Sequence, residues 1–371
     1  MSELWPITII SIILAGLSHY RSVRTADLRG YVRKELFFFV FLVIVMVFFV
    51  GLRTRYNDTT AYTHAYNLIQ GELSELQNYS RELGDNPGFN LINWLLVRLG
   101  FSAQSFLMFY AAVTIAIYLW FIRQYSCNFL LSVFLFITMG CYTFTLAAIK
   151  QCVAVAIALL GVHQYLRGHK IRFVVGVLVA ALFHPYALMF LLVPLLCFRP
   201  WSGGTYLMLV LFVAAGFLLQ YLVGPIIDVT TLLGEEFTTE SFTSDGINPF
   251  RLAVVTAPVL VSFVVQRSIA QRNDRVNHLM MNLSTLNAAI MFVGLFGTAN
   301  YFGRLANYFL IFQTISLPWL ITHFDKRSRQ AMNGIVTVCY LAYFYYANAI
   351  NQSFDAQYSA VTLGEYLKSL F

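Results

Sequence analysis

A series of long apolar runs constrains this chain more than any other feature. Residues 36–52 read LFFFVFLVIVMVFFVGL and contain no charged side chain. A run of this length is close to what an α-helix needs to cross the hydrocarbon of a bilayer. In lipid the backbone must satisfy its own hydrogen bonds, so each such run is expected to be helical. The sequence therefore predicts an all-α polytopic membrane protein.

The composition supports this prediction. Only 11% of the residues are charged and the mean hydropathy is +0.68, whereas soluble domains carry about 25% charged residues. The net charge of +7 would suggest nucleic-acid binding in a soluble protein. In a membrane protein, basic residues instead mark cytoplasmic loops, so no nucleic-acid partner is expected.

About twelve transmembrane segments are predicted, within a single integral membrane domain of residues 1–371. The weakest two are short and are separated by His184-Pro185. They form one bent span, a re-entrant hairpin or two short crossings. The predicted spans cover residues 3–19, 36–52, 103–122, 128–146, 147–166, 171–183, 186–198, 204–223, 250–266, 279–298, 305–321 and 331–348.

Basic residues predict the orientation of these spans, because they collect in cytoplasmic loops. The first loop is basic and is expected inside, which makes both termini and the long loops 53–102 and 224–249 extracytoplasmic. The later basic groups also lie inside if the two short spans that flank His184 together cross the membrane and return. A single bent span would place the last two basic groups outside, so the hairpin or the paired crossing is favoured. The first loop carries Arg21, Arg24, Arg29, Arg33 and Lys34. The later groups are Arg123; Arg167, His169, Lys170 and Arg172; Arg199; Arg267, Arg272 and Arg275; and Lys326, Arg327 and Arg329.

The long loops have different characters. Loop 53–102 contains amphipathic stretches, at residues 59–70 and in NPGFNLINWLLVRLG, which are expected to lie at the membrane interface. Loop 224–249 is polar and includes Glu235, Glu236 and Glu240.

The five cysteines show no metal-ligand spacing, so neither a disulfide framework nor a metal site is expected. The first apolar run lacks a cationic start and is not expected to be a cleaved signal peptide.

Lys150 and Gln151 interrupt the apolar run AAIKQCVAVAIALL. Lys150 is expected four residues into its helix, at a depth of about 6 Å. A cation in the membrane costs roughly 2.5–3.5 kcal/mol, and less near the edge. Either its side chain reaches back to the lipid headgroups, or it faces a polar cavity that binds an anion.

His184 and Asp58 each have two interpretations. His184 either caps the carbonyls at a helix break or acts as a general base, since imidazole titrates near neutrality. Asp58 either caps the helix that follows it or acts as a base itself. Arginines are common at membrane edges, yet the predicted topology places several cations at the outer side together. Because Arg and Lys suit phosphate groups, Arg53, Arg55, Lys150 and Arg304 predict a phosphate-binding pocket.

Four segments carry a further pattern. An arginine-rich stretch leads to an aspartate and a tyrosine-rich helix in GLRTRYNDTTAYTHAY, and a glycine-aromatic segment follows in NPGFNLINWLL. In the third segment, IKQCVAVAIALLGVHQYLRGHKIRFVVGVLVAALFH, a helix begins with a basic residue and Gln. A basic turn follows, and then a second helix that ends in a histidine. An arginine precedes a tyrosine-rich span in YFGRLANYFLIFQTISLP.

These segments resemble the EpsG family of Wzy-like polysaccharide polymerases, from Gly51 to Pro318. The chain departs from the family pattern at Lys150, where Arg is usual, and at Asn86-Pro87, where Glu is usual. The change at Lys150 keeps the charge but loses the bidentate geometry of a guanidinium.

The resemblance implies a glycosyltransferase that joins polyprenyl-diphosphate-linked repeat units into O-antigen, capsule or exopolysaccharide. It implies a site at the outer face of the bacterial plasma membrane, lipid-linked donor and acceptor, surrounding membrane lipids, a chain-length regulator protein as partner, and no cofactor or metal. His184 or Asp58 would be the base. The diphosphate would be bound by Arg53, Arg55, Lys150, Gln151 and Arg304. A ligase with the same donor, a flippase of lipid-linked sugars and a polysaccharide acyltransferase remain alternatives.

Overall fold

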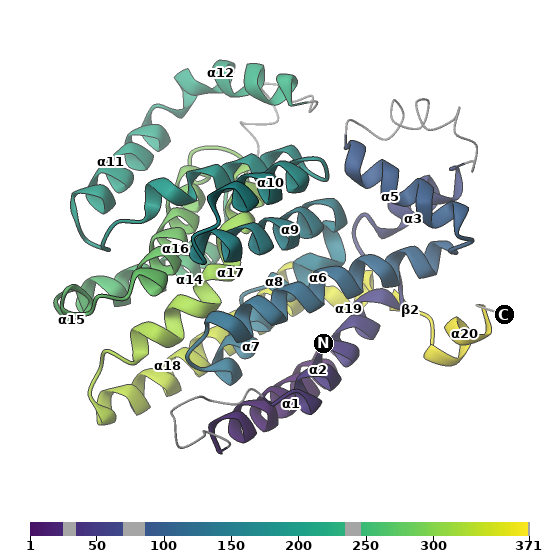
Figure 1. Ribbon diagram of the computed structural model, residues 1–371, viewed down its shortest axis with the longest axis horizontal. Helices are drawn as coiled ribbons and strands as arrows, with labels where there is room; N and C mark the ends of the chain where they lie inside the picture. Colours follow the sequence, from purple (N-terminus) through teal and green to yellow (C-terminus); the bar gives the residue numbers. More distant parts are fainter. Residues whose placement is uncertain (25–34, 70–85, 234–245, 370–371) are drawn as a thin grey trace. The chain divides into compact units, whose positions relative to one another are not determined.

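The computed structural model of this chain is built almost entirely of helices (Figure 1). It describes residues 1–24, 35–69, 86–233 and 246–369. Within these ranges the two short strands β1 and β2 are the only extended elements, so the all-helical prediction is confirmed. The elements are α1 (Leu4–Arg24), α2 (Phe37–Gly51), β1 (Arg53–Arg55), α3 (Thr59–Asn67), α5 (Pro87–Arg98), α6 (Ala103–Tyr125), α7 (Phe129–Thr138), α8 (Cys141–Ala147), α9 (Ile149–Leu166), α10 (Lys170–Ala181), η1 (Pro185–Leu196), α11 (Gly203–Phe217), α12 (Leu219–Leu232), α14 (Pro249–Val264), α15 (Gln266–Gln271), α16 (Arg275–Val293), α17 (Ala299–Ile321), α18 (Lys326–Tyr345), η2 (Tyr346–Asn351), α19 (Phe354–Gln357), β2 (Ser359–Ala360) and α20 (Leu363–Lys368).

The number of membrane-spanning helices is smaller than predicted. By length and hydropathy, α6 and α9 are the two helices of the described chain that suffice to cross a bilayer. The count rises to four if each of two bent pairs, α7 with α8 and α11 with α12, makes one span. About twelve spans are therefore not supported by the structure. Many apolar runs form helices that are too short, such as α2 with 15 residues, or about 22 Å, against a hydrocarbon core of about 30 Å.

Breaks within the apolar runs also differ from the prediction. The expected break at His184-Pro185 is present, and the residues that follow form the 3-10 helix η1. Run 128–146, expected to be one helix, bends by 48° between α7 and α8, where Gly140 adopts a φ of +87°. Run 204–223 bends by 96° between α11 and α12. Hydropathy reports how long an apolar segment is, but it does not report whether the helix within that segment bends.

The amphipathic helices expected in loop 53–102 are present as α3 and α5. On α5, Phe89 and Leu96 are buried, whereas Leu91 and Leu95 are exposed. A helix with apolar side chains on both faces suits the predicted interfacial position. Several residues of the predicted loops lie outside the described residues, namely Arg29, Arg33, Lys34, Gln70, Glu235, Glu236 and Glu240.

Large apolar side chains remain exposed along the helices. On α11, for example, Leu207, Val210 and Leu211 are each more than half exposed. A soluble protein rarely exposes so continuous an apolar face, and hydrocarbon is the solvent that suits it. These apolar helices identify the chain as a membrane protein.

The helices form two compact units, of which unit 1 contains residues 1–184 and 344–371. In unit 1, α2 packs against α1 and α6, and α6 packs against α9. Small side chains of α1 face its neighbours, because Thr8, Ser11, Ala15 and Ser18 are almost fully buried. Small residues let helices approach closely where lipid provides no hydrophobic driving force.

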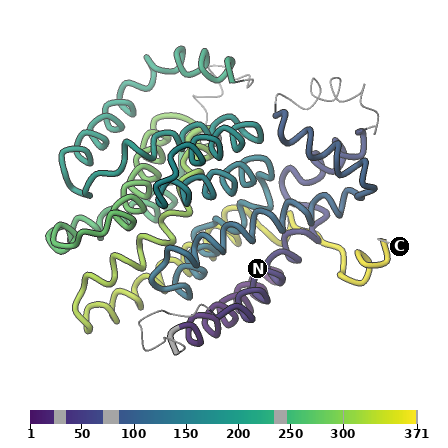
Figure 2. Tube along the Cα trace, viewed as in Figure 1, coloured from purple at the N-terminus to yellow at the C-terminus, as the bar shows by residue number. Residues whose placement is uncertain are grey.

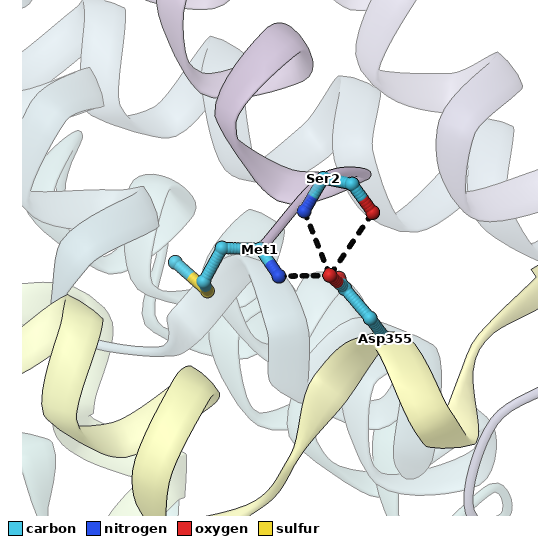
Figure 3. Close-up of polar contacts among 3 residues, drawn as sticks. All are labelled: Met1, Ser2 and Asp355. Atoms are coloured by element: carbon cyan, nitrogen blue, oxygen red, sulfur yellow. Dashed lines mark hydrogen bonds and ion pairs between the residues drawn. The ribbon is translucent and has the colours of Figure 1, made fainter.

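The C-terminal segment of unit 1 returns to the N-terminal helices (Figure 2). Strand β2 pairs antiparallel with β1, with Arg53 opposite Ala360. The amino group of Met1 and the backbone N–H and hydroxyl of Ser2 donate hydrogen bonds to Asp355 Oδ2 (Figure 3). Both terminal segments therefore lie at the end of unit 1 that carries β1, which agrees with the predicted placement of both termini on one side.

Unit 2 contains residues 185–343 and is centred on the hairpin of α16 and α17. Helices α11 and α14 pack on α16. A buried polar network joins the hairpin: Gln313 Nε2 donates to Asn287 Oδ1 at 2.8 Å, and Asn287 Nδ2 donates to the carbonyl of Ala306 at 2.6 Å. Such networks specify how helices pair in a membrane, and they lower the hydropathy of both helices.

Candidate functional site

The hairpin of α9 and α10 brings Lys150 and His184 to the same end of unit 1. The two helices lie side by side (Figure 1) and are joined by a turn at Gly168, whose φ is +86°. Lys150 precedes Gly168 by 18 residues and His184 follows it by 16. At 1.5 Å per residue, the two side chains start about 27 Å and about 24 Å from the turn. The third sequence signature is thus a hairpin whose open end carries both residues.

Two glycines allow this hairpin to close tightly. A Cβ added to Gly176 would lie 3.0 Å from Gly161 Cα, and one added to Gly161 would lie 3.2 Å from the carbonyl oxygen of Phe173. Any side chain at these positions would separate the helices. The close approach fixes the separation of the two ends at which Lys150 and His184 lie.

Lys150 lies closer to the helix end than the sequence predicts. Helix α9 begins at Ile149, so Lys150 is its second residue rather than its fourth. The half-buried side chain places its Nζ atom 5.3 Å from the centre of the Phe89 ring. A cation over an aromatic face gains about 0.5–2 kcal/mol, depending on how far it is desolvated. Phe89 therefore holds the ammonium group at the N-terminal turn of α9.

The start of α5 joins the two ends of the hairpin. The backbone N–H of Gly88 donates to the carbonyl of Leu182 at 2.9 Å. A Cβ at Gly88 would lie 2.8 Å from Leu182 Cβ, so a glycine is needed for this approach. Phe89, the next residue, contacts Lys150. The second sequence signature, NPGF, thus lies between Lys150 and the segment that ends in His184.

Aromatic rings connect this contact to α3. The ring of Tyr62 lies 6.1 Å from that of Phe89, and Phe89 lies 5.1 Å from Tyr110. Helix α3 begins one residue after Asp58. Asp58 is exposed, and its side chain makes no capping hydrogen bond to α3. The Asp58 side chain therefore does not cap α3, and its carboxylate is accessible.

Arg53 is buried, with only 1% of its surface exposed. Its Nε donates to Thr59 Oγ1 at 3.0 Å and its Nη1 donates to the carbonyl of Val50 at 2.5 Å. Burial lowers its pKa from 12.5 to about 10, although the group remains cationic at neutral pH. In the structure Arg53 thus binds the chain itself, whereas Arg55 is exposed and donates to the carbonyl of Ala356 at 2.8 Å. The role of both in diphosphate binding stays a prediction.

Gln151 and Arg304 complete the predicted set. Gln151 is buried in the first turn of α9. Arg304 belongs to unit 2, where it is exposed in the second turn of α17. The structure thus gathers Arg53, Arg55, Asp58, Lys150, Gln151 and His184 within unit 1.

A second cation, which the sequence pattern does not single out, lies near Arg304. Arg251, at the start of α14, donates from Nη2 to Asn307 Oδ1 at 2.9 Å. Its Nη1 lies 3.2 Å from the position of a Cβ on Gly303, which immediately precedes Arg304. Both arginines lie near helix N-termini, where the helix dipole also favours anions. The Asn-Pro pair before Arg251 indicates a helix start, which was the available signal.

A family model, that of the EpsG family, matches residues 36–359. The chain belongs to the EpsG family. Members of this family are Wzy-like polysaccharide polymerases. The match covers β1, α5, the α9–α10 hairpin and α17, so every predicted site residue lies within it. No curated protein and no solved structure matches the chain.

The described residues contain no group of three or more His, Cys, Asp or Glu side chains placed to hold a metal ion. None of the five cysteines, all of which lie in the described part of the chain, forms a disulfide bond.

Proposed function

We propose that this EpsG-family protein is a polymerase that joins polyprenyl-diphosphate-linked oligosaccharide units at the outer face of the bacterial plasma membrane. The observation that supports this proposal best is the shared position of Lys150 and His184 at the open end of the α9–α10 hairpin. A fixed cation and a candidate base at one end of a membrane hairpin suit a reaction that releases an anionic leaving group. Loops 53–102 and 224–249 are proposed to face outward.

The proposed reaction is one glycosyl transfer per cycle. A sugar hydroxyl of the lipid-linked acceptor attacks the anomeric carbon of the donor glycan, and the bond from that carbon to the diphosphate oxygen breaks. The hydroxyl proton passes to His184 Nε2 or Nδ1, or alternatively to Asp58. The polyprenyl diphosphate leaves with the bonding electron pair. The product is a glycan longer by one unit on the acceptor's lipid.

Charge develops on the diphosphate as it leaves, so fixed cations accelerate the reaction. Lys150 is proposed to bind this group, assisted by the amide of Gln151. Arg53 and Arg55 lie in the segment between α2 and α3 and are proposed to support the same site. Arg304, with Arg251 nearby in unit 2, is proposed to bind a diphosphate group as well. These cations are proposed to stabilise the negative charge of the leaving group.

An assay with purified protein tests this proposal. The protein is incubated in nanodiscs with a polyprenyl-diphosphate-linked repeat unit, and the products are separated by gel electrophoresis. A ladder of lengths is the expected result. A single transferred product on a different acceptor would identify a ligase. Movement of the substrate across a liposome membrane without new bonds would identify a flippase, and either result would overturn the proposal.

A further inference from the structure

The end of unit 2 opposite Arg251 and Arg304 is strongly basic. Arg251 lies in the first turn of α14 and Arg304 in the second turn of α17, and the other ends of these helices lead into α15 and α18 (Figure 1). Two contacts hold this end together: Arg272 binds Thr322, and Asn282 Nδ2 donates to the carbonyl of Phe198 at 2.7 Å. We call it the basic end; its exposed cations are Arg199, Arg267, Arg272, Arg275, Lys326, Arg327 and Arg329.

Two of these cations converge on one oxygen atom. Arg272 Nη2 lies 3.5 Å from the carbonyl oxygen of Thr322, and Arg329 Nη2 donates to the same oxygen at 3.0 Å. The two guanidinium groups are therefore about 7 Å apart or less, a distance at which like charges repel. We call this pair the arginine clamp. Each guanidinium has five N–H donors, so most of the donors of the exposed clamp remain for a ligand.

The two nearby carboxylates, of Asp274 and Asp325, each accept a hydrogen bond from a backbone N–H group. Asp274 accepts from the backbone N–H of Asn277 at 3.1 Å, and Asp325 accepts from that of Ser328 at 3.1 Å. Within the described part of the chain, neither clamp arginine has a carboxylate at ion-pair distance. The clamp is therefore a pair of cations that form no direct ion pair with a carboxylate of the described chain.

The electrostatics of His323 agree with this picture. Burial, and next the charge of Arg272, lower the pKa of His323 from 6.5 to about 4, although the nearby carboxylate of Asp274 acts to raise it. His323 is therefore neutral at physiological pH, and its Nδ1 bonds to Ser268 Oγ at 2.8 Å. The neighbouring histidine does not add charge to the clamp, nor does it compete for an anion.

An aromatic collar borders the basic end. Trp201 donates from Nε1 to Ser262 Oγ at 3.0 Å, and its ring lies 4.9 Å from Phe263 and 6.0 Å from Tyr206. Tyr206 and Phe263 are each 49% exposed. Arg267 follows Phe263 by about one helical turn. Aromatic rings next to basic side chains are typical of the depth at which lipid headgroups lie.

We propose that the arginine clamp binds the phosphate of an anionic phospholipid headgroup. Guanidinium groups bind phosphate oxygens bidentately, and a phosphate between them would neutralise the repulsion of the pair. The aromatic collar favours a lipid over an acidic protein segment, because its exposed rings would lie against acyl chains. This site is at the opposite end of unit 2 from Arg304, so the inference stands without the polymerase proposal.

Lipid binding by the full-length protein tests this inference. Nanodiscs of phosphatidylcholine receive increasing fractions of phosphatidylglycerol, and native mass spectrometry counts the anionic lipids that each chain retains. The variant Arg272→Gln/Arg329→Gln removes the clamp, and Arg275→Gln/Arg327→Gln removes the same charge elsewhere on the basic end. To retain the same number of anionic lipids, the clamp variant should need at least about tenfold more phosphatidylglycerol than the unmodified protein. The control variant should need less than about threefold more, because a juxtamembrane cation outside the clamp contributes only its own weak attraction to anionic lipid.

Three results would overturn the inference. An equal loss in both variants would mean diffuse attraction without a site. Displacement of the lipid by free phosphate at roughly physiological ionic strength would mean that the clamp takes soluble anions. Tighter binding of a polyglutamate peptide than of phosphatidylglycerol would mean a protein partner. If the Gln pair unfolds in pure phosphatidylcholine, Arg272→Lys/Arg329→Lys replaces it, and the loss of bidentate geometry should still weaken lipid retention.

Discussion

The Nζ atom of Lys150 lies 5.3 Å from the centre of the Phe89 ring. This contact joins two sequence signatures that are about sixty residues apart in the chain. Phe89 is buried among aromatic rings, with 2% of its surface exposed, so its position is fixed. The ring can therefore help to hold the ammonium group in one place.

Replacing Phe89 by Leu should slow chain elongation by about 2- to 30-fold, the kinetic equivalent of losing a cation–π contact. Leucine keeps an apolar side chain but offers no ring face to Lys150. Elongation rates of purified protein measure the effect. Phe106→Leu is the matched control, since Phe106 is buried in the same aromatic cluster, 6.2 Å from Phe89. Equal rates in the two variants would show that Phe89 matters only for packing.

His184→Gln should insert into the membrane and bind substrate, yet elongate at least about 100-fold more slowly, the lower range for loss of a general base. Glutamine keeps a polar cap at the helix break but cannot accept a proton near pH 7. The pH–rate profile should also lose its rising limb near neutrality. His169→Gln, at the closed end of the same hairpin, is the control. A normal rate and profile for His184→Gln would make His184 a structural cap and leave Asp58 as the base.

Arg304→Ala should lose elongation by about 100-fold or more, as expected when a group that stabilises developing negative charge is removed. Arg251→Gln should show a smaller loss, because its guanidinium also binds Asn307. Quantitative product ladders measure both. Arg327→Ala, on the same unit but at the basic end, should elongate normally. If Arg304→Ala elongates as well as Arg327→Ala, Arg304 has no part in diphosphate binding.

Asp355 links the chain termini, and its contribution to stability should depend on pH. Burial acts to raise its pKa, but hydrogen bonds from the amino terminus and from Ser2 outweigh burial and lower it from 3.8 to about 2. Because the folded-state pKa lies below the unfolded one, the interaction stabilises the fold above about pH 4 and is lost toward pH 2.

Asp355→Asn should accordingly lower the melting temperature near neutral pH, and the difference from wild type should vanish toward about pH 2. Scanning fluorimetry in detergent provides the measurement. Asp228→Asn in unit 2 should show no such difference. A gap that persists at the lowest pH would mean that the asparagine disturbs packing and that the charge of Asp355 is not responsible.

Local patterns predicted those features that depend on neighbouring residues. The apolar runs and the basic turn around Gly168 predicted the hairpin of α9 and α10, which places Lys150 and His184 at one end. The amphipathic periods of α3 and α5 were also visible in the sequence. Each of these features depends on side chains within one or two helical turns.

Bends and long-range contacts could not be predicted in this way. The 96° bend between α11 and α12 interrupts an apolar run that hydropathy treats as continuous, so the predicted number of spans was too large. The pairing of β1 with β2 joins Arg53 to Ala360, and no local pattern connects residues so distant. Arg251 was missed because a lone arginine at a helix start is ordinary until Gly303 is seen beside it.

The elongation rate of Lys150→Ala tests the central claim most directly, because it measures whether the open end of the hairpin performs the chemistry. Purified variants in nanodiscs are supplied with the lipid-linked repeat unit, and ladder formation is followed over time. Lys170→Ala, at the other end of the same hairpin, is the matched control. The account predicts that Lys150→Ala elongates about 100- to 1,000-fold more slowly, that Lys150→Arg retains much of the rate, and that Lys170→Ala is unchanged. An unchanged rate for correctly inserted Lys150→Ala would contradict it.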